Sequence, residues 1–283
     1  MSEQTKFLAQ MAQKALLYEV VVHPKPGLVD PVDTGSHTDM DIFTFLDSTV
    51  SLLPYFQQAS QLGASFVGDK LPALFQQLRV LGRQAEKTMF AATHNINTHK
   101  GAIFSLGIAI GATSFCWQHE KRDLPTIQAT IQGMLVNLIR DDLGAAISKK
   151  SPQTAGEQQF VQYGLLGIRG QAQAGFPVVI EQALPFLRQS HGTTNTRLLD
   201  TLMLILQYTD DSNLIKRAHS QQIMPWARQQ AQRYFDLGGA NTRSGMAFLH
   251  KLNQKFIRYN LSLGGCADLL ILTIYFGLLE NII

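Results

Sequence analysis

Apolar residues recur every three or four positions along most of the chain, which is the spacing of one face of an α-helix. Near the start, Leu8, Met11, Ala15, Tyr18 and Val22 follow this spacing. The same period marks residues 42–56, 71–90, 124–139, 178–187, 198–208, 246–257 and 267–279. Short β-branched runs such as residues 20–22 are isolated and lack hairpin turns. The pattern predicts an all-α fold, a bundle of roughly ten or more helices.

Glycine, proline and asparagine are spread along all 283 residues, and no linker-like segment or repeat of fixed period divides the sequence. A chain of this length can bury a sizeable core. The simplest interpretation is a single helical domain spanning residues 1–283.

Composition limits the classes of binding partner and the cellular compartment that we expect for the protein. The net charge is +3 without a long basic run, which gives no support for a nucleic-acid partner. Cys116 and Cys266 have no metal-like spacing and fit a reducing compartment. Residues 1–14 carry charges where a signal peptide would be apolar, and the uncharged stretch 101–118 contains hydroxyl residues and glycines. We therefore expect a cytoplasmic protein in which 101–118 is a buried helix, not a membrane span.

Five loops, four of which contain glycine, concentrate the charged and hydroxyl residues. They are residues 23–41, 94–101, 164–177, 210–219 and 260–268. In a helical bundle such loops lie where helix ends converge, and function resides on loops more often than on packed helix faces. The candidate chemistry is therefore expected there.

The first loop presents Lys25 between two prolines, which stiffen the backbone around it. Asp39 and Asp41, two positions apart, could direct two carboxylates at one cation. Helix capping is the simpler explanation, because Thr38 and Asp41 have capping-box spacing and acids in a first turn complement the helix dipole.

The next two loops offer cations for phosphate. His99 and Lys100 precede an apolar helix whose free N–H groups could bind an anion, although Thr98 could equally be a plain helix cap. Arg169 lies between Gly167 and Gly170, so its guanidinium could bind phosphate oxygens in a bidentate manner. A solvent-facing arginine in a turn explains the same pattern.

The last two loops both carry carboxylates, and the final one also carries two glycines. Residues 210–213 (DDSN), with Arg217 close behind, suit Mg²⁺ or a ribose, and they also suit a helix cap. Gly264 and Gly265 could form an anion-binding nest, but Asp268 would repel a bare phosphate unless a metal lay between them. Taken together, the loops indicate a Mg²⁺–polyphosphate site, without a Walker A, G-x-G-x-x-G, H-E-x-x-H or G-x-S-x-G motif.

Four stretches resemble the triphosphoribosyl-dephospho-CoA synthase family: residues 24–30 (PKPGLVD), 35–40 (GSHTDM), 97–107 (NTHKGAIFSLG), and 260–262 (NLS) with 267–270 (ADLL). The similarity extends from about Tyr18 to the C-terminus. It implies an all-α enzyme that joins the triphosphoribosyl group of ATP to the ribose 2′-hydroxyl of 3′-dephospho-CoA and releases adenine. The product is a prosthetic-group precursor for the acyl carrier protein of citrate lyase or malonate decarboxylase, and residues 35–41 favour the malonate decarboxylase version.

The resemblance also assigns roles. His37 or Asp39 is expected to be the catalytic base, and Mg²⁺ is the expected companion of the triphosphate. The predicted substrate-binding residues are Lys25, His99, Lys100, Arg169, Arg217 and Ser262. The predicted metal ligands are Asp39, Asp211 and Asp268, and Asp39 cannot be both a ligand and a free base. The expected partners are ATP and 3′-dephospho-CoA, with transient contact to the downstream prosthetic-group transferase or the acyl carrier protein.

Several loop positions depart from the family pattern. Gln171 replaces a glutamate, Asp210 a glycine, Ala218 and His219 two glycines, and Leu263 a proline. These changes leave room for diverged specificity or a weakened enzyme. Two other classes therefore stay open: a Mg²⁺-dependent hydrolase acting on nucleotide ribose, and a non-catalytic module that binds nucleotide or carrier protein. Gln171 favours the second.

Overall fold

The structure, a computed structural model, describes residues 2–144 and 155–283. Within these ranges the chain forms helices and loops and contains no strand, so the predicted all-α class is confirmed. The first helices are α1 (Glu3–Val21), α2 (Ile42–Ser65), α3 (Leu71–Ala92), α4 (Lys100–Gln118), α5 (Leu124–Met134) and α6 (Leu138–Asp142). They are followed by α8 (Ala155–Tyr163), α9 (Gly167–Gln173), a π-helical segment (Val178–Ala183), α10 (Leu184–Gln189), α11 (Thr194–Tyr208), α12 (Ser212–Ala218), α13 (Ile223–Asp236), α14 (Arg243–Arg258) and α15 (Gly264–Leu279).

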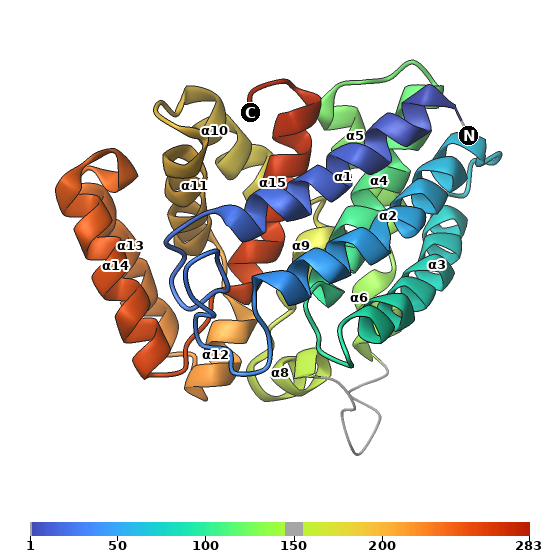
Figure 1. Cartoon of the computed structure of the whole chain (residues 1–283). Coiled ribbons are helices and arrows are strands. Elements are labelled where there is room, and N and C mark those ends of the chain that lie inside the picture. The colour runs from blue at the N-terminus through green and yellow to red at the C-terminus, as the bar shows by residue number, and fades with distance from the viewer. Residues whose placement is uncertain (1, 145–154) are drawn as a thin grey trace.

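Two helices, α4 and α15, form the centre of the molecule because their sequences are apolar on nearly every side. Their residues, together with those of α1, α2, α3 and α11, belong to one continuous hydrophobic core. Figure 1 shows the pair α13 and α14 at one end of the molecule and α3 at the other. Helix α4 is also the one described helix long and apolar enough to cross a membrane, yet 72% of that stretch is buried inside the protein. The expectation of a buried helix at 101–118 is therefore confirmed.

Glycines allow α2 and α4 to approach each other closely. A Cβ on Gly63 would overlap with the carbonyl of Gly111, and a Cβ on Gly107 would overlap with the Tyr55 hydroxyl. That hydroxyl donates to the Ile103 carbonyl across the contact, at 2.9 Å. The crossing fixes the start of α4 relative to α2, and the candidate site lies at that start.

The loops that connect these helices meet on one side of the bundle. The α1–α2 loop lies beside α12, as Figure 1 shows. There Arg217 donates to the Ser36 carbonyl at 2.8 Å and to the Asn260 carbonyl at 3.3 Å, so α12 holds the first loop against the α14–α15 loop. Ser36 Oγ reinforces this contact by donating to the Leu261 carbonyl at 2.5 Å. Three segments distant in sequence are thereby tied together.

Some local expectations were wrong in detail. The N-cap of α2 is Asp41, whose side chain caps Thr44 in a capping box, so Thr38 is not the capping residue. The N-cap of α4 is His99 without a side-chain bond, and Thr98 donates instead to Ser48. The segment 124–139 divides into α5 and α6.

Candidate functional site

A cavity of ≈ 150 Å³, called here the polar cavity, opens where the loops meet. Seven predicted site residues line it: Lys25, His37, His99, Lys100, Arg217, Ser262 and Asp268. Three do not, namely Asp39, Arg169 and Asp211. Glu19 and Asn97, which were not predicted as site residues, also line the cavity. So does Asn213, which belongs to the 210–213 segment considered for Mg²⁺ or a ribose.

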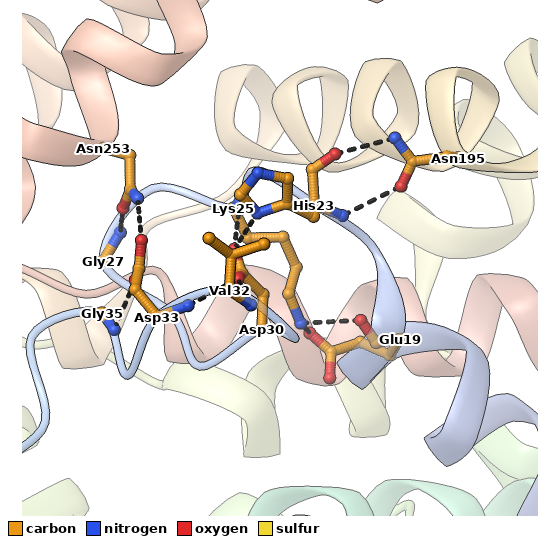
Figure 2. Close-up of polar contacts among 10 residues, drawn as sticks. All are labelled: Glu19, His23, Lys25, Gly27, Asp30, Val32, Asp33, Gly35, Asn195 and Asn253. Atoms are coloured by element: carbon orange, nitrogen blue, oxygen red, sulfur yellow. Dashed lines mark hydrogen bonds and ion pairs between the residues drawn. The ribbon is translucent and has the colours of Figure 1, made fainter. Parts of the chain in front are cut away.

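The α1–α2 loop is held in place by side chains that bond to its backbone (Figure 2). Asn195 pairs with both backbone groups of His23, at 2.9 and 2.7 Å. Asn253 accepts from the Gly27 N–H at 2.8 Å and donates to Asp33 at 3.0 Å. Asp30 bonds the His23 ring at 2.8 Å and accepts from two backbone N–H groups further along the loop. This network fixes the backbone on both sides of Lys25, whose side chain is buried.

Lys25 is buried, with 1% of its surface exposed, and it is paired with Glu19. Its Nζ donates to Glu19 Oε1 at 2.5 Å and to the Glu19 carbonyl at 2.6 Å, at the end of α1 (Figure 2). The pair has no net charge, so Lys25 does not offer an unpaired positive charge to a phosphate group. The sequence held a signal for Glu19, because it falls on the buried stripe that includes Ala12, Ala15 and Leu16.

His37 and Arg217 form a second contact at the cavity. Arg217 Nη2 lies 3.2 and 3.4 Å from the two ring nitrogens of His37, and His37 Nε2 lies 3.4 Å from Ser262 Oγ. Burial, and then the charge of Arg217, lower the pKa of His37 below its usual value of 6.5. The imidazole is therefore neutral at pH 7. His37 and Asp39 were the two predicted candidates for the catalytic base. Asp39 is exposed, and His37 is the one that lines the cavity.

His99 is buried and neutral. Burial and the nearby charge of Lys25 lower its pKa to about 3. The Thr98 hydroxyl donates to Ser48 Oγ at 2.8 Å, and Ser48 Oγ lies 2.7 Å from His99 Nδ1, where the ring tautomer sets which group donates. His99 Nε2 has no hydrogen-bond partner among the described residues. Buried polar atoms are nearly always bonded, so this nitrogen is suited to a ligand.

Asp268, on the first turns of α15, reaches the start of α4. Its carboxylate lies against Gly101, and a Cβ at position 101 would overlap with it. Burial raises the pKa of Asp268 to about 8, and the charges of Asp211 and Glu19 add to this effect. The site thus contains an acid that carries a proton at neutral pH unless a cation binds beside it.

The three predicted metal ligands do not come together. Asp211 is fully buried as the N-cap of α12, where it accepts from the Asn213 and Leu214 N–H groups at 2.9 Å. It also accepts from the Cys266 N–H at 2.8 Å, which ties α12 to α15. The described residues contain no group of three His, Cys, Asp or Glu side chains placed for a metal ion. Of the predicted set, only Asp268 faces the polar cavity.

A second cavity of ≈ 650 Å³, called here the arginine cavity, adjoins the first and shares Asn97 and Lys100 with it. Lys100 pairs with Glu86 at 3.0 Å on this border. Arg169 lines the arginine cavity from the short helix α9, not from a loop, and its Nε donates to Asp142 at 3.0 Å. Arg79 pairs with the same carboxylate. The predicted cations are therefore divided between two adjoining cavities.

Known proteins match this chain over nearly its whole length. A family model described as ATP:dephospho-CoA triphosphoribosyl transferase matches residues 5–283. A relative in Lactiplantibacillus plantarum, named probable 2-(5''-triphosphoribosyl)-3'-dephosphocoenzyme-A synthase, is 53% identical over 281 residues, covering 99% of both chains. A relative of the same name in Streptococcus pyogenes serotype M1 is 40% identical, covering 98% of this chain and 97% of its own. The protein named CitXG in Leuconostoc mesenteroides subsp. cremoris is 48% identical over 93% of this chain and 57% of its own length.

No solved structure matches the chain. The family match spans the segments that build both cavities, and the full-length relatives bear the name of one synthase. The chain therefore belongs to the ATP:dephospho-CoA triphosphoribosyl transferase family.

Proposed function

We propose that the chain joins the triphosphoribosyl group of ATP to the ribose 2′-hydroxyl of 3′-dephospho-CoA and releases adenine. The product is the prosthetic-group precursor for the acyl carrier protein of malonate decarboxylase or citrate lyase, as the family resemblance implies. The observation that carries the proposal is the polar cavity, which brings together His37, His99, Arg217, Ser262 and Asp268 from four distant segments.

The reaction replaces a bond from the anomeric carbon to adenine with a bond to the acceptor oxygen. Displacement at an anomeric carbon passes through an oxocarbenium-like state, as in glycoside hydrolysis. His37 takes the proton of the 2′-hydroxyl, because it lines the cavity and its lowered pKa leaves it unprotonated at pH 7. With its proton on the unpartnered Nε2, His99 donates to the leaving adenine and stabilises the negative charge that develops on it. The adenine anion then takes up the proton that His37 removed from the hydroxyl, so neutral adenine is released.

Mg²⁺ fits this cavity through Asp268. Asp268 lines the polar cavity, and one carboxylate together with substrate phosphates can hold Mg²⁺. When bound, Mg²⁺ would neutralise part of the triphosphate charge. Arg217 would bind the phosphates, together with Lys100, which lies on the border of the cavity and pairs there with Glu86.

The test incubates the chain with ATP, Mg²⁺ and 3′-dephospho-CoA and measures free adenine by chromatography. We expect adenine to appear only when both nucleotides are present. His37→Gln should lower the rate by roughly 10²–10⁴-fold, the contribution of a general base. His191→Gln, at an exposed histidine outside both cavities, is the matched control and should leave the rate unchanged.

Two outcomes would overturn the proposal. Adenine release from ATP without an acceptor would identify a hydrolase, and ATP binding without adenine release would identify a non-catalytic module. Gln171, the residue that favoured the non-catalytic alternative, lines neither cavity, and its Oε1 lies 3.5 Å from the Val178 N–H. That departure therefore does not remove a group from the polar cavity.

A further inference from the structure

The arginine cavity is the larger of the two adjoining cavities, and the proposed chemistry leaves it unused. It lies among α3, α4, α6 and α9, with Asn97 and Lys100 at the border with the polar cavity. A ligand longer than one nucleotide could therefore place its ribose in the polar cavity and extend past Lys100 into the arginine cavity.

The charged side chains of the arginine cavity favour a diphosphate. Arg79, Arg83, Arg169 and Lys100 face two carboxylates, Asp142 and Glu86, so the described lining carries a net charge of +2 (four minus two). Asp142 holds Arg79 and Arg169 side by side, and the bond from Arg169 is donated by its Nε at 3.0 Å. Arg83 is exposed and has no ion pair with another described residue. Guanidinium groups with free N–H donors match phosphate oxygens.

The remaining wall of this cavity is apolar. Phe75, Leu78, Ile103 and Ile108 are buried, and Phe104 is half-buried beside them. A hydrated triphosphate gains nothing from such a wall, whereas a chain of methylene, methyl and amide groups does. Of the two proposed substrates, only dephospho-CoA has a diphosphate followed by such a chain, its pantetheine arm.

We propose that the arginine cavity binds the diphosphate and pantetheine arm of the acceptor nucleotide. The inference rests on the proposed function, since it assigns one of its two substrates to this cavity. The adenosine ribose of dephospho-CoA then lies in the polar cavity beside His37, and the triphosphate of ATP is bound on the Arg217 side.

The first experiment uses 4′-phosphopantetheine, which carries the arm and one phosphate but no adenosine. We expect it to inhibit adenine release competitively against dephospho-CoA and non-competitively against ATP. Inhibition that competes with ATP instead, or no inhibition at all, would overturn the assignment.

The second experiment compares Arg83→Gln with Arg243→Gln, an exposed arginine on α14, as the matched control. Because a lost bond to a charged group weakens binding by roughly tenfold or more, Arg83→Gln should raise KM for dephospho-CoA by about that factor. KM for ATP and kcat should stay within about twofold of the wild type, and the control should change neither KM. An equal or larger rise in KM for ATP would assign the cavity to the triphosphate and overturn the proposal.

The two proposals fail differently. If the wild type releases no adenine under any condition, the proposed function is wrong, and the cavity is then tested by calorimetric titration of 4′-phosphopantetheine alone. Heat of binding in the wild type that is lost in Arg83→Gln and kept in Arg243→Gln would uphold the cavity assignment. Equal heats in all three proteins would reject it.

Discussion

At the scale of single residues, the protonation of Asp268 in the polar cavity affects the free energy of unfolding. Its pKa is about 8 in the fold against an ordinary 3.8, so the folded chain keeps a proton that the unfolded chain has released between these pH values. A raised pKa of an acid means that stability is lost as pH rises through this window. The loss amounts to up to about 1.4 kcal/mol for each pH unit.

We therefore predict that Asp268→Asn inactivates the chain yet stabilises it in the absence of metal. The gain in unfolding free energy should grow from about pH 4 to pH 8 and level off above it. Urea denaturation in EDTA at several pH values measures this, with Asp69→Asn at an exposed site as the control. A gain that did not vary with pH would contradict the assignment. Mg²⁺ added at pH 8 should stabilise the wild type more than the variant.

The Glu19–Lys25 pair allows a second prediction at this scale. Lys25→Met should destabilise the chain by about 3–5 kcal/mol, because it leaves the Glu19 carboxylate buried without its partner. Adding Glu19→Gln should restore a large part of that loss, since the double variant has no charged group at either of these two positions. Lys6→Met, which breaks an exposed pair with Glu3, is the control and should have little effect on urea denaturation. If the double variant were no more stable than Lys25→Met, the unpaired Glu19 carboxylate would not be the cause of the lost stability.

At the scale of elements, Asp211 shows why a residue pattern could suggest the wrong role. A carboxylate followed by Ser212 and Asn213 fits both a Mg²⁺ ligand set and a helix cap, and in the fold it is a cap. Its two oxygens accept three backbone N–H groups and join α12 to α15. The bond from the Cys266 N–H occupies the second carboxylate oxygen and favours the cap over the metal site. Cys266 lies 55 residues away in sequence, so local spacing does not reveal this contact.

We predict that Asp211→Asn lowers stability by about 1–3 kcal/mol, because an amide cannot accept from all three N–H groups. The Mg²⁺ concentration needed for half-maximal activity should stay the same. Asp123→Asn is the control, since Asp123 caps α5 at an exposed site and should matter less. Thermal unfolding and a Mg²⁺ titration of adenine release measure the two effects. An increased Mg²⁺ requirement with unchanged stability would restore the metal role.

Periodicity predicted most of the long helices because most of them bury one stripe, but it did not mark α13. Helix α4, which is apolar on nearly every side, was expected from its uncharged sequence instead. The short helices α6, α8, α9 and α12 were not predicted, since five to nine residues are too few to establish a period. The placement of Arg169 was missed for this reason. With α9 assigned as a loop, nothing indicated that Arg169 faces Asp142 and not the polar cavity.

At the scale of the whole molecule, the sequence predicted most of the loops that line the polar cavity. It did not predict that the candidate residues would be divided between two adjoining cavities. Glycine-rich loops with charged residues identified most of the polar cavity, because helix ends in a bundle converge. The two cavities and their shared border depend on the crossing of α2, α3 and α4, which no local pattern describes. The pairing of Lys25 with Glu19 likewise required the fold of the α1–α2 loop.

The arrangement of both cavities predicts that CoA is a poor acceptor. CoA carries a 3′-phosphate beside the attacking 2′-hydroxyl, and our proposal already assigns the described cations near His37 to ATP. A buried charge without a partner costs several kcal/mol, so adenine release with CoA should be slower by about a hundredfold or more. The measurement compares CoA and dephospho-CoA at equal concentration. Comparable rates would show that the polar cavity does not sense the 3′ position.

The contact between Gly101 and Asp268 has an evolutionary consequence. Because the carboxylate occupies the space that a side chain at position 101 would need, position 101 can gain a side chain only where residue 268 gives way. Among relatives, we expect any residue larger than glycine at 101 to occur together with a smaller residue at 268. Such a double change would mark a lineage that has given up the acid and with it the proposed transfer. A residue other than glycine at 101 is thus a marker, readable from an alignment, of a chain that has lost this chemistry.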